Sequence, residues 1–163
     1  MKQGWTTRAI GRHLVDIPGI AKTIETYSFN KVKIEPLLDI QSQEEYEKFI
    51  GRKEGSLRAV KQGKINSLFL ERVQHANEAV TLISWDNSDA EEKYKFFVFD
   101  TYFRAGTRFL SYSGEVSQSR KSTALATREE MSREWHQIPT GKTPEGVGYV
   151  VDDVILVDKA FNR

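Results

Sequence analysis

The sequence contains no cysteine, and this absence excludes several kinds of protein at once. Without a thiol there is no disulfide, no thiolate nucleophile and no cysteine-based zinc site. It leaves the compartment open, because proteins of either redox environment can do without cysteine. The first residues, Met1 to Arg8, contain no apolar run of seven or more. We therefore expect no signal peptide and no membrane span in the chain as it stands.

An excess of charge of one sign is also missing. The chain has 24 Lys and Arg residues against 23 Asp and Glu, a net charge of +1, and 39% of its residues are hydrophobic. This balance argues against disorder and against strong nonspecific binding of nucleic acid. A globular chain of 163 residues buries roughly 70% of its unfolded surface. We therefore predict one folded domain over residues 1–163.

Apolar periodicity predicts an α+β fold, made mainly of an antiparallel meander with two principal helices packed on it. Residues 8–17 alternate and stop at Pro18-Gly19, and residues 24–29 and 32–38 form a hairpin pattern around Asn30-Lys31. Four runs of period two follow later, over residues 65–75, 79–86, 94–104 and 107–116. The third run is apolar on both faces, which predicts a central strand covered on both sides.

Both predicted helices begin with a capping box. In the first, Ser42 and Glu45 form the box and Gly63 ends the helix. Its predicted sheet-facing stripe consists of Tyr46, Phe49, Ile50, Leu57 and Val60. In the second, Thr127 and Glu130 form the box, and the helix continues through Met131, Trp135 and Ile138 until Pro139. Strand character returns over residues 146–158.

Phosphate and metal sites are poorly supported. Thr140-Gly141-Lys142-Thr143 resembles the end of a phosphate-binding loop, but His136 replaces the leading glycine and Pro144 blocks the helix that should follow. The acidic segment from Asp86 to Glu92 has oxygen ligands without the spacing of a calcium loop, so we predict a solvated turn without metal. The three histidines show no metal-ligand spacing, and no cofactor is expected.

Catalytic and nucleic-acid readings are equally weak. Tyr112-Ser113-Gly114 lacks the leading glycine of a nucleophile elbow, so a serine hydrolase has no sequence support. Lys93-Tyr94-Lys95-Phe96 interleaves basic and aromatic residues, a composition found in single-strand nucleic-acid platforms and also in ordinary sheet cores. Without a basic excess, the core interpretation is favoured. We therefore predict a protein that is not an enzyme and binds no nucleic acid.

Four segments resemble a known family. They are residues 8–18, with an arginine, a Gly-Arg pair and an apolar-acidic-apolar-proline close; residues 27–35; Leu82 to Trp85; and residues 145–152. In this order they are similar to the N-terminal domain of the immunity proteins that protect bacteria from type VI secretion lipase effectors. The family often has cysteines at the positions of Ala9 and Tyr149, which implies that these two strands are neighbours.

The resemblance implies a periplasmic protein that binds a cognate phospholipase effector and blocks its active site. It also implies that the chain is the N-terminal half of a two-domain protein. Surface loops and aromatic anchors on a rigid scaffold suit such a role. Oligomeric state is left open, and membrane insertion is not expected. The predicted partner-binding residues are Trp5, Trp85, Asp86, Asn87, Asp89, Glu91 and Glu92.

Two further points stay open at the level of sequence. Core packing is the competing interpretation of Trp85 and Trp135, because each continues an apolar pattern. The competing function is a small-ligand-binding or enzymatic domain with an apolar pocket under the curved sheet. An enclosed cavity with convergent polar groups would favour that alternative, and a filled core with exposed apolar surface would favour the interaction protein.

Overall fold

A computed structural model describes residues 4–10, 13–22, 26–29, 31–61, 67–86 and 96–157. Strands predominate, with two α-helices, as the sequence predicts. The elements are β1 Trp5–Ile10, β2 His13–Pro18, β3 Tyr27–Phe29, β4 Val32–Pro36, α1 Gln43–Ala59, β5 Phe69–Gln74, β6 Val80–Trp85, β7 Phe96–Ala105, β8 Arg108–Ser117, α2 Lys121–Glu134, β9 Trp135–Gln137, β10 Gly148–Val151 and β11 Val154–Val157.

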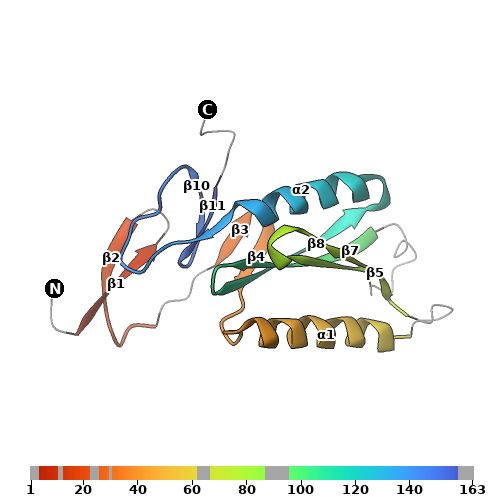
Figure 1. The fold of residues 1–163 in the computed structure, drawn as a ribbon, viewed down its shortest axis with the longest axis horizontal. Helices are drawn as coiled ribbons and strands as arrows, with labels where there is room; N and C mark the ends of the chain where they lie inside the picture. Colours follow the sequence, from red (N-terminus) through yellow and green to blue (C-terminus); the bar gives the residue numbers. More distant parts are fainter. Residues whose placement is uncertain are drawn as a thin grey trace.

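A six-stranded sheet forms the centre, with the order β3-β4-β8-β7-β6-β5. The predicted meander is confirmed, because β5 to β8 pair antiparallel in succession, and the β3–β4 hairpin joins it through β8. Two tight connections allow this. Asn77 adopts a positive φ in the turn between β5 and β6, and Gly106 does so between β7 and β8. The sheet lies between α1 on one face and α2 on the other (Figure 1).

Helix α1 is anchored on the sheet by buried aromatic and aliphatic side chains. Ser42 Oγ accepts a hydrogen bond from the Glu45 amide, which confirms the predicted cap. Tyr46 and Ile50 are buried, while Phe49 and Leu57 are half-buried against the same cluster. Val60 was expected in this stripe, but the helix ends at Ala59 and Val60 is exposed. The predicted stop at Gly63 lies outside the described residues.

Helix α2 differs from its prediction at both ends. It begins at Lys121, six residues before Thr127, directly after a 3₁₀ turn over Gln118–Arg120. Thr127 is interior, and its hydroxyl donates to the Thr123 carbonyl, so the predicted capping box is wrong. The helix ends before Trp135, whose backbone pairs with Leu156 of β11 instead. Strand pairing therefore overrides the helical spacing of Met131, Trp135 and Ile138.

Strand β7 is central, as its two apolar faces predict. It lies between β6 and β8, with Tyr102 in the cluster under α1 and Phe103 in the cluster under α2. Trp135 also belongs to the α2-side core, 6.0 Å from Phe103 between ring centroids. The core interpretation of Trp135 is thereby confirmed.

A three-stranded sheet, ordered β10-β11-β9, is held to the main sheet by two tyrosine hydroxyls. Tyr149 of β10 accepts a hydrogen bond from the Ser28 amide of β3 at 2.8 Å, and Tyr27 of β3 accepts one from the Asp152 amide at 3.0 Å. The expected neighbourhood of Ala9 and Tyr149 is not realised as strand pairing: β1 and β10 belong to different sheets, and Ala9 pairs with Leu14. Tyr149 binds β3 instead.

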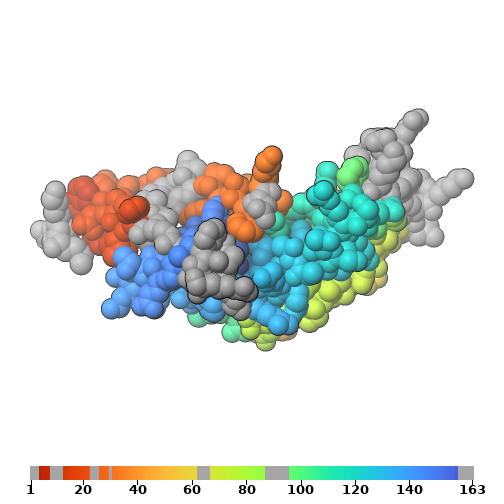
Figure 2. All heavy atoms as spheres, turned by 90° about the horizontal axis from the view of Figure 1, so that it is seen from above, coloured from red at the N-terminus to blue at the C-terminus, as the bar shows by residue number. Residues whose placement is uncertain are grey.

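The first segment is a two-stranded hairpin, where the sequence predicted a single strand before Pro18-Gly19. Strands β1 and β2 pair over their full length, from Trp5 opposite Pro18 to Ile10 opposite His13. They form a sheet of their own. The hairpin makes up one end of the elongated molecule, beside the β10–β11 strands (Figures 1 and 2).

Candidate functional site

The predicted contact residues fall on separate parts of the molecule. Trp85 ends β6 and is half-buried, with its ring 5.1 Å from that of Phe97. Asp86 follows at the strand end and is also half-buried. Trp5 begins β1, in the separate hairpin sheet. The structure therefore does not bring Trp5 and Trp85 into one site. The remaining predicted residues, Asn87, Asp89, Glu91 and Glu92, lie outside the described residues.

The β1–β2 hairpin exposes apolar side chains. Trp5, Leu14 and Val15 are each more than a third exposed, and Ile20, just after β2, is almost fully exposed. An isolated two-stranded hairpin is marginally stable in water. Apolar surface on such an element is typical of a contact surface for another protein or domain.

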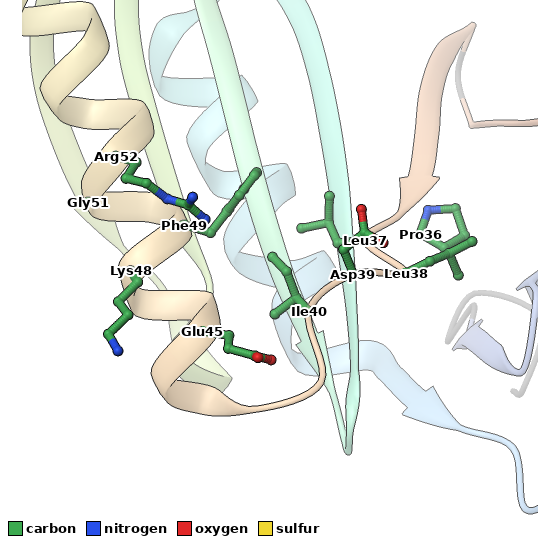
Figure 3. Close-up of a pocket in the computed structure, with 10 residues that line it drawn as sticks. All are labelled: Pro36, Leu37, Leu38, Asp39, Ile40, Glu45, Lys48, Phe49, Gly51 and Arg52. Carbon is green, nitrogen blue, oxygen red and sulfur yellow. The ribbon is translucent and has the colours of Figure 1, made fainter.

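A second exposed surface was missed by sequence reasoning. An open groove of about 970 Å³ runs between residues 36–40 and the N-terminal half of α1, where Glu45, Lys48, Phe49, Gly51 and Arg52 line it (Figure 3). We call it the α1 groove. The wall opposite α1 includes the apolar Pro36-Leu37-Leu38 run, which lies just before the helix cap. This apolar run was the sequence signal that could have indicated the groove, but it was interpreted only as the end of a strand.

Backbone hydrogen bonds hold the shape of the α1 groove. The Leu37 amide donates to the Phe109 carbonyl of β8, and the Ile40 amide donates to the Leu37 carbonyl to close a turn. At the helix end, the Gln41 amide donates to the Glu45 carboxylate at 2.8 Å. This hydrogen bond lowers the pKa of Glu45, so the cap is anionic at neutral pH. The wall formed by residues 37–41 is therefore fixed on both the sheet and the helix.

The charged side chains of the α1 groove are not all paired. Lys48 forms an ion pair with Glu44 at 2.6 Å. Among the described residues, no carboxylate lies within ion-pairing distance of Arg52, and no cation lies within that distance of Asp39 on the opposite wall. In Figure 3, Arg52 extends from the helix toward the side of the groove that holds Leu37 and Ile40, whereas Lys48 points away.

A buried network under α2 is connected like a catalytic triad, but substrate cannot reach it. Glu129 contacts His75 Nδ1 at 3.1 Å, and His75 Nε2 lies 2.8 Å from the hydroxyl of Thr81. Thr81 is fully buried and also hydrogen-bonded to Thr101. A nucleophile must reach its substrate, so this network does not support hydrolysis. Burial lowers the pKa of His75, which favours the neutral imidazole.

Arg128 completes the polar interior. Its Nε donates to the Thr101 hydroxyl at 2.8 Å, and its guanidinium carbon lies 4.9 Å from the Phe99 ring centroid and 5.1 Å from that of Tyr112. Burial lowers the pKa of Arg128, and contact with two ring faces partly offsets the loss of water. The residue therefore links α2 to two strands rather than forming an accessible anion site.

Within the described part of the chain, no three His, Asp or Glu side chains gather as a metal ion would require. Neither described helix has the length and apolar character needed to cross a bilayer.

Comparison with known proteins gives a consistent result. Residues 6–143 match the family model of the Tle cognate immunity protein 4 N-terminal domain. A search of curated proteins gave no match. The apo structure of the immunity protein TplEi of the type VI secretion system from Pseudomonas aeruginosa is similar over 96% of this chain, with 26% identity and a TM-score of 0.81.

A chain of the Tle4–Tli4 complex is similar over 97% of this chain, again with 26% identity and with a TM-score of 0.80. A further TplEi structure, complexed with a peptide called L, shares the fold with a TM-score of 0.73 at 23% identity. This chain spans about half the length of the solved chains that it matches, 52% of the first two. The match over residues 6–143, in the order of elements described above, shows that the chain belongs to the Tle cognate immunity protein 4 N-terminal domain family.

Proposed function

We propose that this protein is an immunity protein that binds a lipase effector of a type VI secretion system and neutralises it by blocking access to the active site. The observation that carries the proposal is the family match over residues 6–143. The likeness to a chain of the Tle4–Tli4 complex over 97% of this protein supports it. That structure is a complex of a Tle4 protein with a Tli4 protein.

The geometry favours binding over catalysis. The one triad-like cluster that we describe, Glu129, His75 and Thr81, is closed to substrate by the burial of Thr81. The alternative function required an apolar ligand pocket under the curved sheet. Between α1 and the sheet, however, the Tyr46 and Phe109 rings stack with 4.7 Å between their centroids, so side chains fill this space. The α1 groove is open to solvent instead. We accordingly propose that the protein is not an enzyme.

Three parts of the sequence-based hypothesis belong to the same proposal. The chain acts as the N-terminal half of a two-domain immunity protein, in keeping with its span of 52% of the similar solved chains. It acts in the periplasm, a location that its match to an immunity-protein family supports. Trp5, Trp85 and Asp86 contribute to the partner surface, together with Asn87, Asp89, Glu91 and Glu92. Exposed Trp5 in the β1–β2 hairpin supports this role.

The test is inhibition of a candidate lipase effector, which is sought among the genes beside that of this protein. The purified lipase is mixed with increasing amounts of the purified chain, and binding is measured by calorimetry alongside phospholipid hydrolysis. We expect a stoichiometric complex and a loss of hydrolysis that follows complex formation. The chain alone should hydrolyse no phospholipid. Binding without inhibition would contradict active-site blocking, and no binding would contradict the function as a whole.

Location is tested separately in bacterial cells that export the same lipase to the periplasm. The chain is expressed with an added export leader in one strain and without it in a matched strain. We expect survival only with the leader, because an inhibitor must share the compartment of its target. Equal protection in both strains would contradict the periplasmic assignment and leave the inhibitor function intact.

A further inference from the structure

We propose that the α1 groove is the docking site for a segment of the lipase effector that carries an apolar anchor residue next to a carboxylate. The inference rests on the proposed function and deepens it, because it assigns a place and a chemistry to the contact. It adds a surface that the predicted contact residues Trp5, Trp85 and Asp86 do not include. Three features of the groove support this assignment.

The first part is the apolar lining. Leu37 and Ile40 from one wall and Phe49 from the helix are only half-buried, and Leu38 is 68% exposed. Phe49 already packs edge-on against Tyr102, with 5.3 Å between ring centroids. Tyr102 therefore supports the ring from the sheet side. The half-buried outer part of the Phe49 ring, whose centroid lies 5.6 Å from Lys53 Nζ, offers apolar area. Burying such area against an apolar anchor residue is the main source of affinity at protein contacts.

The second part is charge complementarity. Arg52 extends over the groove and has no carboxylate partner among the described residues (Figure 3). A guanidinium binds a carboxylate through two parallel hydrogen bonds, so an Asp or Glu beside the anchor residue would complete this pair. Asp39 on the other wall repels a second carboxylate there. The two charges fix which way the segment lies across the groove.

The third part is the helix surface itself. Gly51 lines the groove, and a Cβ added there would meet nothing within 4 Å. Glycine in a helix interior weakens the helix, and no neighbouring side chain requires its small size. Its effect is to leave a part of the helix that borders the groove without a side chain. The walls are preformed by the hydrogen bonds of Leu37, Ile40 and Gln41, which reduces the ordering cost of binding.

A pair of glycine variants tests the site. Gly51→Trp adds a bulky side chain at a residue that lines the α1 groove, whereas Gly55→Trp adds the same side chain one turn along α1 at a residue that does not line it. Both positions are open, with nothing within 4 Å of an added Cβ, so both variants should fold. With the lipase that the parent chain binds as the probe in calorimetry, we expect Gly51→Trp to weaken binding about tenfold or more. Gly55→Trp should bind like the parent.

Charge reversal tests the chemistry of the segment. Arg52→Glu should weaken binding about tenfold, and the loss should shrink at high salt because rim charges are screened. Lys142→Glu makes the same change of charge on an exposed turn far from the groove residues in sequence, and should have little effect. Equal losses for the two variants would mean that only net charge matters and would overturn the specific pairing with Arg52.

Cross-linking identifies the occupant. A photoreactive benzoylphenylalanine replaces Leu38, an exposed residue that lines the groove, or Lys61 beyond the helix end as a control. We expect only the first to capture the lipase, at a segment with an apolar residue beside Asp or Glu. Capture at a segment of other composition overturns the assigned chemistry.

Failure of the site can be distinguished from failure of the function. If the lipase binds the parent chain and Gly51→Trp binds equally well, the assignment of the groove is wrong and the proposed function stands. If the parent does not bind, both fail.

Discussion

Replacing Tyr46 tests how α1 is held on the sheet. Tyr46 is 1% exposed, its ring stacks on Phe109, and its hydroxyl donates to the Tyr102 carbonyl at 2.9 Å. Burial raises the pKa of Tyr46, so the hydroxyl keeps the proton that this hydrogen bond needs. Tyr46→Phe removes the hydroxyl alone and should lower the free energy of unfolding by about 1–2 kcal/mol. Tyr46→Ala also opens a cavity and should cost about 3–5 kcal/mol.

The matched comparison is Phe49→Ala, three residues further along the same helix. Phe49 is half-buried, so its truncation should cost only about 1–2 kcal/mol. Urea unfolding followed by circular dichroism gives the three free energies from the transition midpoints and slopes. A Tyr46→Phe variant as stable as the parent would refute the hydroxyl's role. A Phe49→Ala loss equal to that of Tyr46→Ala would refute the assignment of Tyr46 as the main anchor.

The other predictions concern different parts of the molecule. Tyr27→Phe and Tyr149→Phe should each cost about 0.5–1.5 kcal/mol, and a double-mutant cycle in urea should show whether the two losses add. Stability should fall as the pH drops below the ordinary histidine value of 6.5. The unfolded chain then binds a proton that the buried, depressed-pKa His75 does not, and His75→Gln should flatten this part of the melting-temperature profile. Gly55→Ala should raise the free energy of unfolding by about 0.5–1 kcal/mol, because the site is helical and open; an unchanged urea midpoint would contradict this. Millimolar calcium should leave the melting temperature unchanged, because the Asp86 to Glu92 segment lacks calcium-loop spacing.

Local signals were sufficient where they agreed with the tertiary contacts. The Ser42 cap with an apolar stripe led correctly to α1, and period-two runs led to β5 through β8. Strand β7 is the clearest case, since its two apolar faces already required cover from both sides. In each of these elements, propensity, pattern and burial favour the same structure.

Other elements depend on contacts that no local pattern encodes. Helix α2 starts at Lys121 without a side-chain cap, so the Thr127 box inside it was misleading. Trp135 has helical spacing but joins β9, because β11, about twenty residues later, offers a strand partner. The α1 groove arises from the approach of residues 36–40 to α1, a distance that neither segment specifies alone. Exposed residues carry no periodic signal, which is why the site was harder to predict than the core.

The two tyrosine hydrogen bonds also order events during synthesis of the chain. Ser28 and Tyr149 are 121 residues apart, and Tyr27 and Asp152 are 125 apart. Strand β3, at the edge of the sheet, therefore keeps an exposed backbone donor until β10 has left the ribosome. Contacts of such long sequence separation form slowly, and an uncovered edge strand can pair with another chain. Strands β10 and β11 thus protect the first part of the sheet, and a chain that stalls or is truncated before them would be the form most prone to aggregate.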